Sequence, residues 1–217
     1  MNCIVTAGPT YETLDNVRRL TNFSTGRLGT ELANFLVERG HEVTLMIGEQ
    51  STYNGARNAQ RIETFSTTED LRDWLQAQSH RTVNAVFHAA AVSDFKFGKI
   101  WRRSPKGELT EVKSGKISTR QGTLLAELVP TLKIIGSLRD WFPKARLVGW
   151  KYEVDGDRAD VIRAAEKQLA ESVTDFCVAN GRAYGEGFGL VNPSGNCVHL
   201  PNATALFRAL EKFIHSK

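Results

Sequence analysis

Cysteine is scarce in this chain, and long apolar runs are absent. The three cysteines, Cys3, Cys177 and Cys197, lie far apart and form no Cys-x-x-Cys pair. This spacing argues against a disulfide framework and against a cysteine-based zinc site. No apolar run approaches the length of a membrane span, and the first residues lack the basic region and apolar core of a secretion signal. We therefore expect a cytoplasmic protein with no membrane partner.

Several familiar catalytic motifs are also missing. The sequence has no His-Glu-x-x-His motif, no Tyr-x-x-x-Lys pair and no compact Gly-x-Gly-x-x-Gly turn, and we assign no residue as a metal ligand. Of the 217 residues, 41% are hydrophobic and 24% are charged. These proportions are ordinary for a soluble globular protein. The length suits one α/β domain or two small ones, and we expect a single domain spanning residues 1–217.

Strand and helix patterns alternate along most of the chain. Apolar runs predict strands at 3–6, 42–47, 61–65, 84–91, 146–150 and 175–179. Apolar residues at helical spacing predict helices at 25–39, 67–78, 158–171 and 202–214. Residues 190–191 and 197–200 flank a turn and predict a terminal hairpin. This order predicts a Rossmann-like α/β fold, with a mostly parallel sheet and helices on both faces.

The segment after the first predicted strand has the composition of an anion-binding site. Gly8 ends the strand, and residues 24–29 open the next helix. A strand, a turn of small residues and a helix N-terminus can bind phosphate, because unpaired N–H groups and the helix dipole face the anion. About 15 residues separate the turn from the helix, unlike the compact dinucleotide turn. An ordinary loop with a Ser or Thr cap is the alternative interpretation.

A second segment of small residues follows the strand predicted at 84–91. Ala89, Ala90 and Ala91 would let a planar or phosphorylated ligand approach the backbone, at the strand end where such folds place their active sites. Asp94 can bind a ribose hydroxyl or, through water, a magnesium ion; the alternative is a plain turn residue. His88 is expected to be a packed strand residue.

A third segment, residues 96–120, concentrates the positive charge. It carries eight basic and two acidic residues, a net charge of +6, whereas the whole chain carries +4. The basic residues are Lys96, Lys99, Arg102, Arg103, Lys106, Lys113, Lys116 and Arg120. A nucleic-acid binder more often spreads such residues over a face or helix, so we expect no nucleic-acid partner. The segment is predicted to be a long basic flap loop over a phosphorylated substrate, or else a solvated loop.

Five motifs in one order resemble those of a known enzyme family. Residues 8–29, GPTYETLDNVRRLTNFSTGRLG, match a pattern of a turn, Asp-x-Val-Arg and Asn-x-Ser-Ser/Thr-Gly-x-x-Gly. Further matches are residues 89–95 (AAAVSDF), 115–119 (GKIST), 175–181 (DFCVANG) and 189–200 (GLVNPSGNCVHL). Over essentially its whole length the chain is similar to phosphopantothenoylcysteine synthetase, also called phosphopantothenate–cysteine ligase, in its stand-alone form.

The resemblance implies a ligase of coenzyme A biosynthesis. Such enzymes join 4′-phosphopantothenate to L-cysteine through an acyl nucleotidylate, with CTP or ATP as cosubstrate and Mg²⁺ accompanying the nucleotide, and they act as homodimers. No flavin is implied, because the sequence shows no counterpart of the flavin-dependent decarboxylase to which many bacterial members are fused.

The resemblance also implies roles for particular residues. Lys116 would be the phosphate-contacting lysine and would act in catalysis with Asn22 and Arg18. The implied nucleotide-binding residues are Gly8, Ser24, Gly26, Ala89, Ala90, Asp94, Lys116, Trp150 and Lys167, and the implied substrate-binding residues are Arg18, Asn22 and Ala91. Lys113 is a competing phosphate lysine, and Glu171 stands near the place of a second bacterial lysine, so the choice between CTP and ATP stays open.

Two other classes of function are consistent with the residues. One is an NAD(P)-dependent reductase of Rossmann type, favoured by the strand–helix–strand start and by Glu49 near the ribose-binding position. The missing compact glycine turn argues against it. The other is a non-catalytic nucleotide-binding protein with the same fold.

Overall fold

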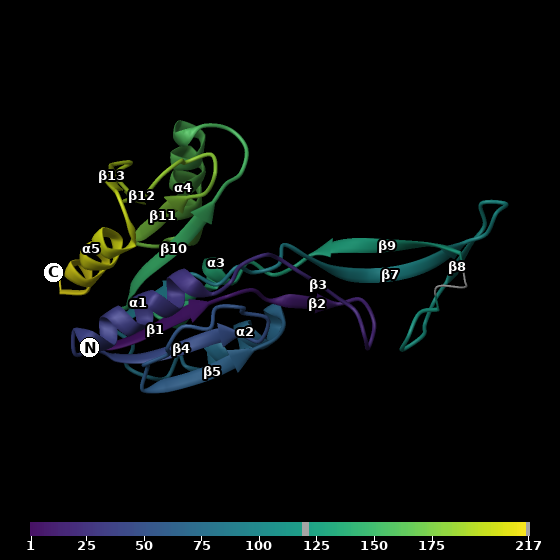
Figure 1. Ribbon diagram of the computed structural model, residues 1–217, viewed down its shortest axis with the longest axis horizontal. Coiled ribbons are helices and arrows are strands. Elements are labelled where there is room, and N and C mark those ends of the chain that lie inside the picture. Colours follow the sequence, from purple (N-terminus) through teal and green to yellow (C-terminus); the bar gives the residue numbers. More distant parts are fainter. Residues whose placement is uncertain (119–121, 216–217) are drawn as a thin grey trace.

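The computed structural model describes residues 1–118 and 122–215, which are built around one eight-stranded sheet (Figure 1). Its strands, in order across the sheet, are β13 (Cys197–Leu200), β12 (Phe188–Val191), β11 (Phe176–Asn180), β10 (Arg146–Tyr152), β6 (Ala85–His88), β1 (Asn2–Ala7), β4 (Glu42–Gly48) and β5 (Arg61–Phe65). The strands from β11 to β5 pair in parallel, and β12 and β13 add an antiparallel edge. The predicted Rossmann-like sheet and the terminal hairpin are confirmed.

Helices cover both faces of this sheet. On one face lie α1 (Arg27–Glu38) and α5 (Ala203–His215); on the other lie α2 (Thr68–Ala77), α3 (Ile134–Trp141) and α4 (Arg158–Ser172). In β1, Cys3 and Val5 pack with α1 and α5, whereas Ile4 packs with α2 and α3. Successive strand residues point to opposite faces, so a strand buried on both sides is apolar throughout. This is why β1 could be recognised as a short apolar run.

A three-stranded arm and a small hairpin project from this body (Figure 1). The arm consists of β8 (Leu109–Glu111), β7 (Phe95–Arg103) and β9 (Thr123–Pro130), paired antiparallel in that order, and the hairpin of β2 (Tyr11–Thr13) and β3 (Arg19–Thr21). The prediction of a loop without regular structure at 96–120 is therefore wrong for β7 and β8, and Arg120 lies outside the described residues. Most arm residues are exposed, so the arm lacks the apolar alternation that reveals a strand in sequence.

The remaining differences concern element ends. The strand predicted at 84–91 ends at His88, and Ala91 continues it only as an isolated bridge to Pro9. No helix within residues 1–118 and 122–215 combines the length and the apolar character that crossing a membrane requires.

Helix α1 packs so closely on β1 that a side chain at Gly29 has no room. A Cβ there would lie 2.6 Å from Ala7 Cβ and 3.1 Å from the carbonyl oxygen of Thr6, and both atoms belong to the central strand. We expect Gly29→Ala to lower the free energy of unfolding by about 1–3 kcal/mol through overpacking, as measured by urea denaturation.

Gly136→Ala is the matched control. Gly136 is also helical, but a Cβ there would meet nothing within 4 Å. The substitution should raise the free energy of unfolding by up to about 1 kcal/mol, because alanine is the better helix former. Equal destabilisation by the two substitutions would contradict the close-packing argument.

Candidate functional site

The region at the carboxyl ends of β1 and β6, here called the crevice, is where a sheet of this kind is expected to bind its ligand. The chain leaves β1 through α1 towards β4 on one side, and leaves β6 through the arm and α3 towards β10 on the other. The two connections therefore diverge between β1 and β6. Open α/β sheets bind their ligands outside the strand ends at such a topological switch point.

Hydrogen bonds tie the loops after β1 and β6 together. The amide of Ala91 donates to the carbonyl of Gly8 at 2.9 Å, and the amide of Thr10 donates to the carbonyl of Ala91 at 3.1 Å. The side-chain amide of Asn22 donates to that same carbonyl at 2.8 Å, and its Oδ1 accepts from the amide of Ser24 at 3.1 Å. The structure thus brings four predicted residues together: Gly8, Asn22, Ser24 and Ala91.

The N-terminus of α1 lies beside this loop, next to a serine that the sequence analysis missed. The N-cap residue, Gly26, has φ 79° and caps the helix with no side-chain hydrogen bond. A Cβ at Gly26 would lie 2.8 Å from Ser51 Oγ, and one at Gly8 would lie 1.9 Å from it. Ser51 Oγ is buried and has no hydrogen-bond partner in the described part of the chain. A helix N-terminus and an unpaired hydroxyl at one place suit an oxyanion such as phosphate.

The alanines after β6 use their amides within the protein. The amide of Ala89 donates to the carbonyl of Thr6 at 3.1 Å, and the amide of Ala90 donates to the hydroxyl of Thr6 at 3.1 Å. These residues can therefore offer a ligand their methyl groups and carbonyl oxygens. Thr6 Oγ1 also lies 2.9 Å from His88 Nδ1, and burial lowers the pKa of His88 to about 4. His88 is thus a neutral, packed strand residue, as predicted.

Asp94, at the end of the same loop, is paired with a lysine. Its carboxylate forms an ion pair with Lys133, the N-cap residue of α3, and both side chains are largely exposed. The amide of Thr131 donates to the carbonyl of Asp94 at 2.9 Å, which fixes the loop against the residues before α3. Lys133 is a second feature that the sequence analysis missed, because α3 was not predicted.

Two more buried polar atoms lack partners at the carboxyl ends of the strands. They are Trp150 Nε1, on β10, and Asn180 Oδ1, at the end of β11; neither has a hydrogen-bond partner among the described residues. The strand register pairs Trp150 with Val178, two residues before Asn180. Buried polar groups without partners are rare, and the polar groups of a bound ligand would satisfy them.

A second group of predicted residues lies where the β2–β3 hairpin meets the arm. The Asp15 carboxylate forms an ion pair with Arg18 and accepts from the amide of Ile117 at 3.1 Å, while Arg18 donates to the carbonyl of Ile117 at 2.6 Å. These bonds place Lys116 next to Arg18 at a surface cavity of about 430 Å³. Within the described chain the Lys116 ammonium has no ion-pair partner.

The pair with Arg18, helped by backbone amides, holds the pKa of Asp15 well below its ordinary value. A carboxyl group with a lowered pKa stabilises the folded state above its unfolded pKa, and this stabilisation is lost as the pH falls through the folded pKa. The contact between the hairpin and the arm is therefore intact at neutral pH.

The strand β3 separates the two groups of residues. Arg18 precedes this three-residue strand and Asn22 follows it, so their Cα atoms are at most about 13 Å apart. One extended ligand can span both groups. Lys167 joins neither: its side chain is 76% exposed on α4 and lies 3.8 Å from Glu171, and among the described residues it forms no hydrogen bond or ion pair with another predicted site residue.

The hairpin also separates Gly8 from α1, where a dinucleotide-binding protein has one tight glycine turn. Glu49, the ribose-binding candidate of the reductase alternative, accepts a hydrogen bond from the Tyr11 hydroxyl at 3.2 Å. This part of the crevice is therefore shaped by the hairpin.

A Rossmann-like sheet with an anion-type site at its switch point is typical of α/β domains that bind nucleotides or other phosphorylated ligands. The chain matches the family model described as the DNA/pantothenate metabolism flavoprotein C-terminal domain over residues 1–204. The chain belongs to this family.

Relatives and solved structures agree with this assignment. The chain is 34% identical over 178 residues to the coenzyme A biosynthesis bifunctional protein CoaBC of Thermococcus kodakarensis. The aligned region covers 82% of this chain and 40% of the relative. The chain thus spans less than half the length of the curated relatives that it matches. The crystal structure of the C-terminal domain of a CoaBC protein matches with a TM-score of 0.71 and 25% identity, over 98% of this chain and 93% of that one.

A more distant structure shares the fold. It is a Cab2 mutant in complex with phosphopantothenate-cysteine, with a TM-score of 0.68 and 18% identity, over 99% of this chain and 89% of that one.

The contact between the hairpin and the arm can be tested through Asp15. We expect Asp15→Asn to remove the ion pair with Arg18 and to weaken the bond to the Ile117 amide. That amide should exchange with deuterium about tenfold faster, because its acceptor loses its negative charge, while the amides of β1 keep their rates. Mass spectrometry of exchanged peptides measures both. Glu108→Gln, in an exposed turn of the arm, is the control and should leave the exchange of Ile117 unchanged; an unchanged rate in Asp15→Asn would contradict the contact.

Proposed function

We propose that this domain is a phosphopantothenate–cysteine ligase of coenzyme A biosynthesis, which joins 4′-phosphopantothenate to L-cysteine at the expense of CTP or ATP. The family match over residues 1–204, together with the anion-type site at the switch point, carries this proposal. The relative from Thermococcus kodakarensis is named for coenzyme A biosynthesis, and a protein of the same fold has been solved with phosphopantothenate-cysteine. Both support the choice of substrates.

The proposed reaction has two displacement steps and needs no nucleophilic side chain. The carboxylate of phosphopantothenate attacks the α-phosphorus of the nucleotide, which forms the acyl nucleotidylate and releases pyrophosphate. The amine of cysteine then attacks the acyl carbon, which forms the amide, releases the nucleoside monophosphate and sets one proton free. Such steps are accelerated by aligning the reactants and by placing cations near the growing phosphate charge.

The residues of the crevice and those where the hairpin meets the arm would have different roles in this reaction. The crevice formed by Gly8, Gly26 and Ser51 suits one phosphate group of the reactants. Arg18 is held by Asp15 and Ile117, so it serves chiefly to position the segment that carries Lys116. The Lys116 ammonium is then the cation that can meet the α-phosphate.

Three predicted residues, Trp150, Asn22 and Ala91, and one that was not predicted, Asn180, fit the nucleoside and the acyl group. Trp150 Nε1 and Asn180 Oδ1, both buried and unpaired among the described residues, suit the polar edge of a base or a ribose. Asn22 and Ala91 form the wall along which the acyl nucleotidylate would lie. Nothing in the exposed, paired position of Lys167 supports its expected contact with the nucleotide.

Magnesium would arrive with the triphosphate. Mg²⁺ usually keeps several waters and takes one or two carboxylates beside phosphate oxygens, and Asp94 is the carboxylate that follows β6. Its ion pair with Lys133 would open for this role, and the freed lysine would face the same phosphates.

We also propose that the protein is a homodimer joined through the arm. The arm extends away from the body (Figure 1), and Phe95, Leu109, Leu125 and Leu128 on it are 46%, 54%, 38% and 50% exposed. A three-stranded sheet with apolar residues on its surface needs a covering surface, and a second arm provides one. Light scattering at micromolar concentration should give the mass of a dimer, and a monomer alone would refute this assembly.

The proposed activity is tested by pyrophosphate release from CTP or ATP with phosphopantothenate, with and without cysteine. One of the two nucleotides should support release, and the amide product should require cysteine. Thermal stabilisation should follow the same nucleotide. Stabilisation by NADPH alone would exclude the ligase in favour of a reductase.

We expect Lys116→Gln to keep the fold and to slow pyrophosphate release by about 10²–10³-fold, because one preorganised cation near the α-phosphate is lost. Lys113→Gln is the control, since Lys113 Nζ lies 3.8 Å from Glu111 and its side chain is 81% exposed. Lys99→Gln, on β7, should also be mild. An inactive Lys113→Gln beside an active Lys116→Gln would assign the cation to Lys113. Near-normal rates in both would leave the arm without a catalytic cation.

A second substitution separates the two half-reactions. Asn22→Asp removes the donor to the Ala91 carbonyl and puts a negative charge beside the proposed phosphate site. We expect amide formation to fall more than nucleotide binding does, as measured by rapid quench and by calorimetry. Asn34→Asp is the matched control. Asn34 lies away from the crevice, donates to the Ala56 carbonyl at 2.7 Å and accepts from the Asn58 amide at 2.8 Å. Wild-type amide formation in Asn22→Asp would remove Asn22 from the site.

A further inference from the structure

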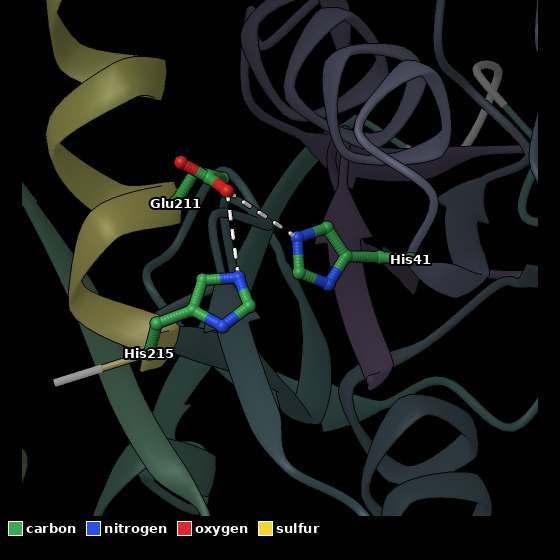
Figure 2. A group of neighbouring side chains, drawn as sticks. All are labelled: His41, Glu211 and His215. Carbon is green, nitrogen blue, oxygen red and sulfur yellow. Dashed lines mark ion pairs between the residues drawn. The ribbon is translucent and has the colours of Figure 1, made fainter. Parts of the chain in front are cut away.

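Three ligand-type side chains meet at the end of the sheet opposite the crevice (Figure 2). His41 directly precedes β4, and Glu211 and His215 lie one turn apart on α5. Within residues 1–118 and 122–215 this is the one group of three His, Cys, Asp or Glu residues whose ligand atoms all lie within 4.8 Å of one another. Since β4 has seven residues, the group is about 20 Å from the switch point.

The distances between these atoms are longer than hydrogen bonds. Glu211 Oε1 lies 3.9 Å from His41 Nε2 and 3.4 Å from His215 Nε2 (Figure 2), whereas N–H···O bonds are usually about 2.7–3.2 Å long. In a tetrahedral zinc site, with bonds of about 2.0–2.1 Å, neighbouring ligand atoms are about 3.3 Å apart. Shifts of less than about 1 Å would bring these two pairs to the spacing of a zinc site, and the His41–His215 pair, whose ligand atoms lie within 4.8 Å of each other, needs a shift of at most about 1.5 Å.

The unpaired ring nitrogens of His41 are an independent indication that this group binds an ion. Its side chain is 3% exposed, and both of its ring nitrogens lack a hydrogen-bond partner among the described residues. Leaving a buried polar group unpaired costs free energy. Burial lowers the pKa of His41, as do the nearby amino terminus and His215, while Glu211 opposes the shift. The shift favours the uncharged ring, which is the form that binds a metal ion.

We propose that His41, Glu211 and His215 bind a divalent transition-metal ion, with zinc preferred. Two imidazoles and one carboxylate are ligands that suit zinc, and a site with three protein ligands leaves one position for water. Glu211 is 24% exposed and His215 52% exposed in their side chains, so the ion can enter from solvent. Because the group is remote from the crevice, the ion would act on stability by tying the last turn of α5 to the segment between α1 and β4.

The test uses untagged protein that has been treated with a chelator and kept free of nucleotide. Titration with Zn²⁺ in a calorimeter should show one equivalent bound, and the same equivalent should raise the Tm. Co²⁺ in place of Zn²⁺ should give visible absorption bands typical of four-coordinate cobalt. His215→Asn and Glu211→Gln change partly exposed residues and should fold normally. Each should weaken Zn²⁺ binding more than about tenfold and abolish the rise in Tm.

Two controls distinguish this site from adventitious binding. His80→Asn removes an exposed histidine in the turn after α2, and Cys197→Ser removes the least buried thiol; both variants should bind Zn²⁺ as the wild type does. Absence of stoichiometric binding to the wild type would overturn the proposal. So would binding that persists unchanged in His215→Asn and Glu211→Gln, because the ion would then sit elsewhere.

Discussion

One backbone carbonyl, that of Ala91, organises the crevice. It accepts one hydrogen bond from the Thr10 amide, just after β1, and another from the side chain of Asn22, just after the β2–β3 hairpin. A hairpin can therefore be inserted between β1 and α1 without loss of the switch-point geometry, because Asn22 returns the chain to the place where it left the sheet. The Ser24 amide is bonded to Asn22 in turn, and α1 begins shortly afterwards. The position of the helix N-terminus, and with it the anion site, depends on this shared acceptor.

The layers of the fold could be predicted because burial leaves a periodic pattern. Strands covered on both faces are apolar throughout, and α1, α2, α4 and α5 each turn one apolar face inward. Helix α3 was not predicted, because it is short and buries only Ile134 and Leu138. The arm was not predicted for a different reason. Its strands are held by antiparallel pairing while most of their side chains face solvent. Four of the nine residues of β7 are charged, and β9 is largely apolar although it is exposed, so neither strand has the alternation of a half-buried strand.

The site could be predicted in part, for the residues that follow β1 and β6. Gly8, Asn22 and Ala91 come together because the two strands are neighbours and the loops share hydrogen bonds. Ser51 could not be found in this way, since its closeness to Gly8 arises from the position of β4 beside β1, which only the sheet order reveals. Lys167 is the opposite case, a residue that was predicted but that the structure does not bring to the site. It was assigned through the resemblance alone, and in the structure it is an exposed helical residue beside Glu171.

The two ends of the parallel sheet differ in which buried polar atoms lack hydrogen-bond partners. At the carboxyl ends the loops diverge, and they leave buried polar atoms on Ser51, Trp150 and Asn180 unpaired among the described residues, as a site that awaits a ligand would. At the amino ends, the two ring nitrogens of His41 are buried between β4 and α5 and have no hydrogen-bond partner among the described residues. An ion held there would lie too far from the crevice to take part in the proposed reaction. It would act by fixing α5, which packs against β1 and α1. Any influence on the crevice would pass through β1, which ends just before Gly8, or through α1, which begins after Gly26.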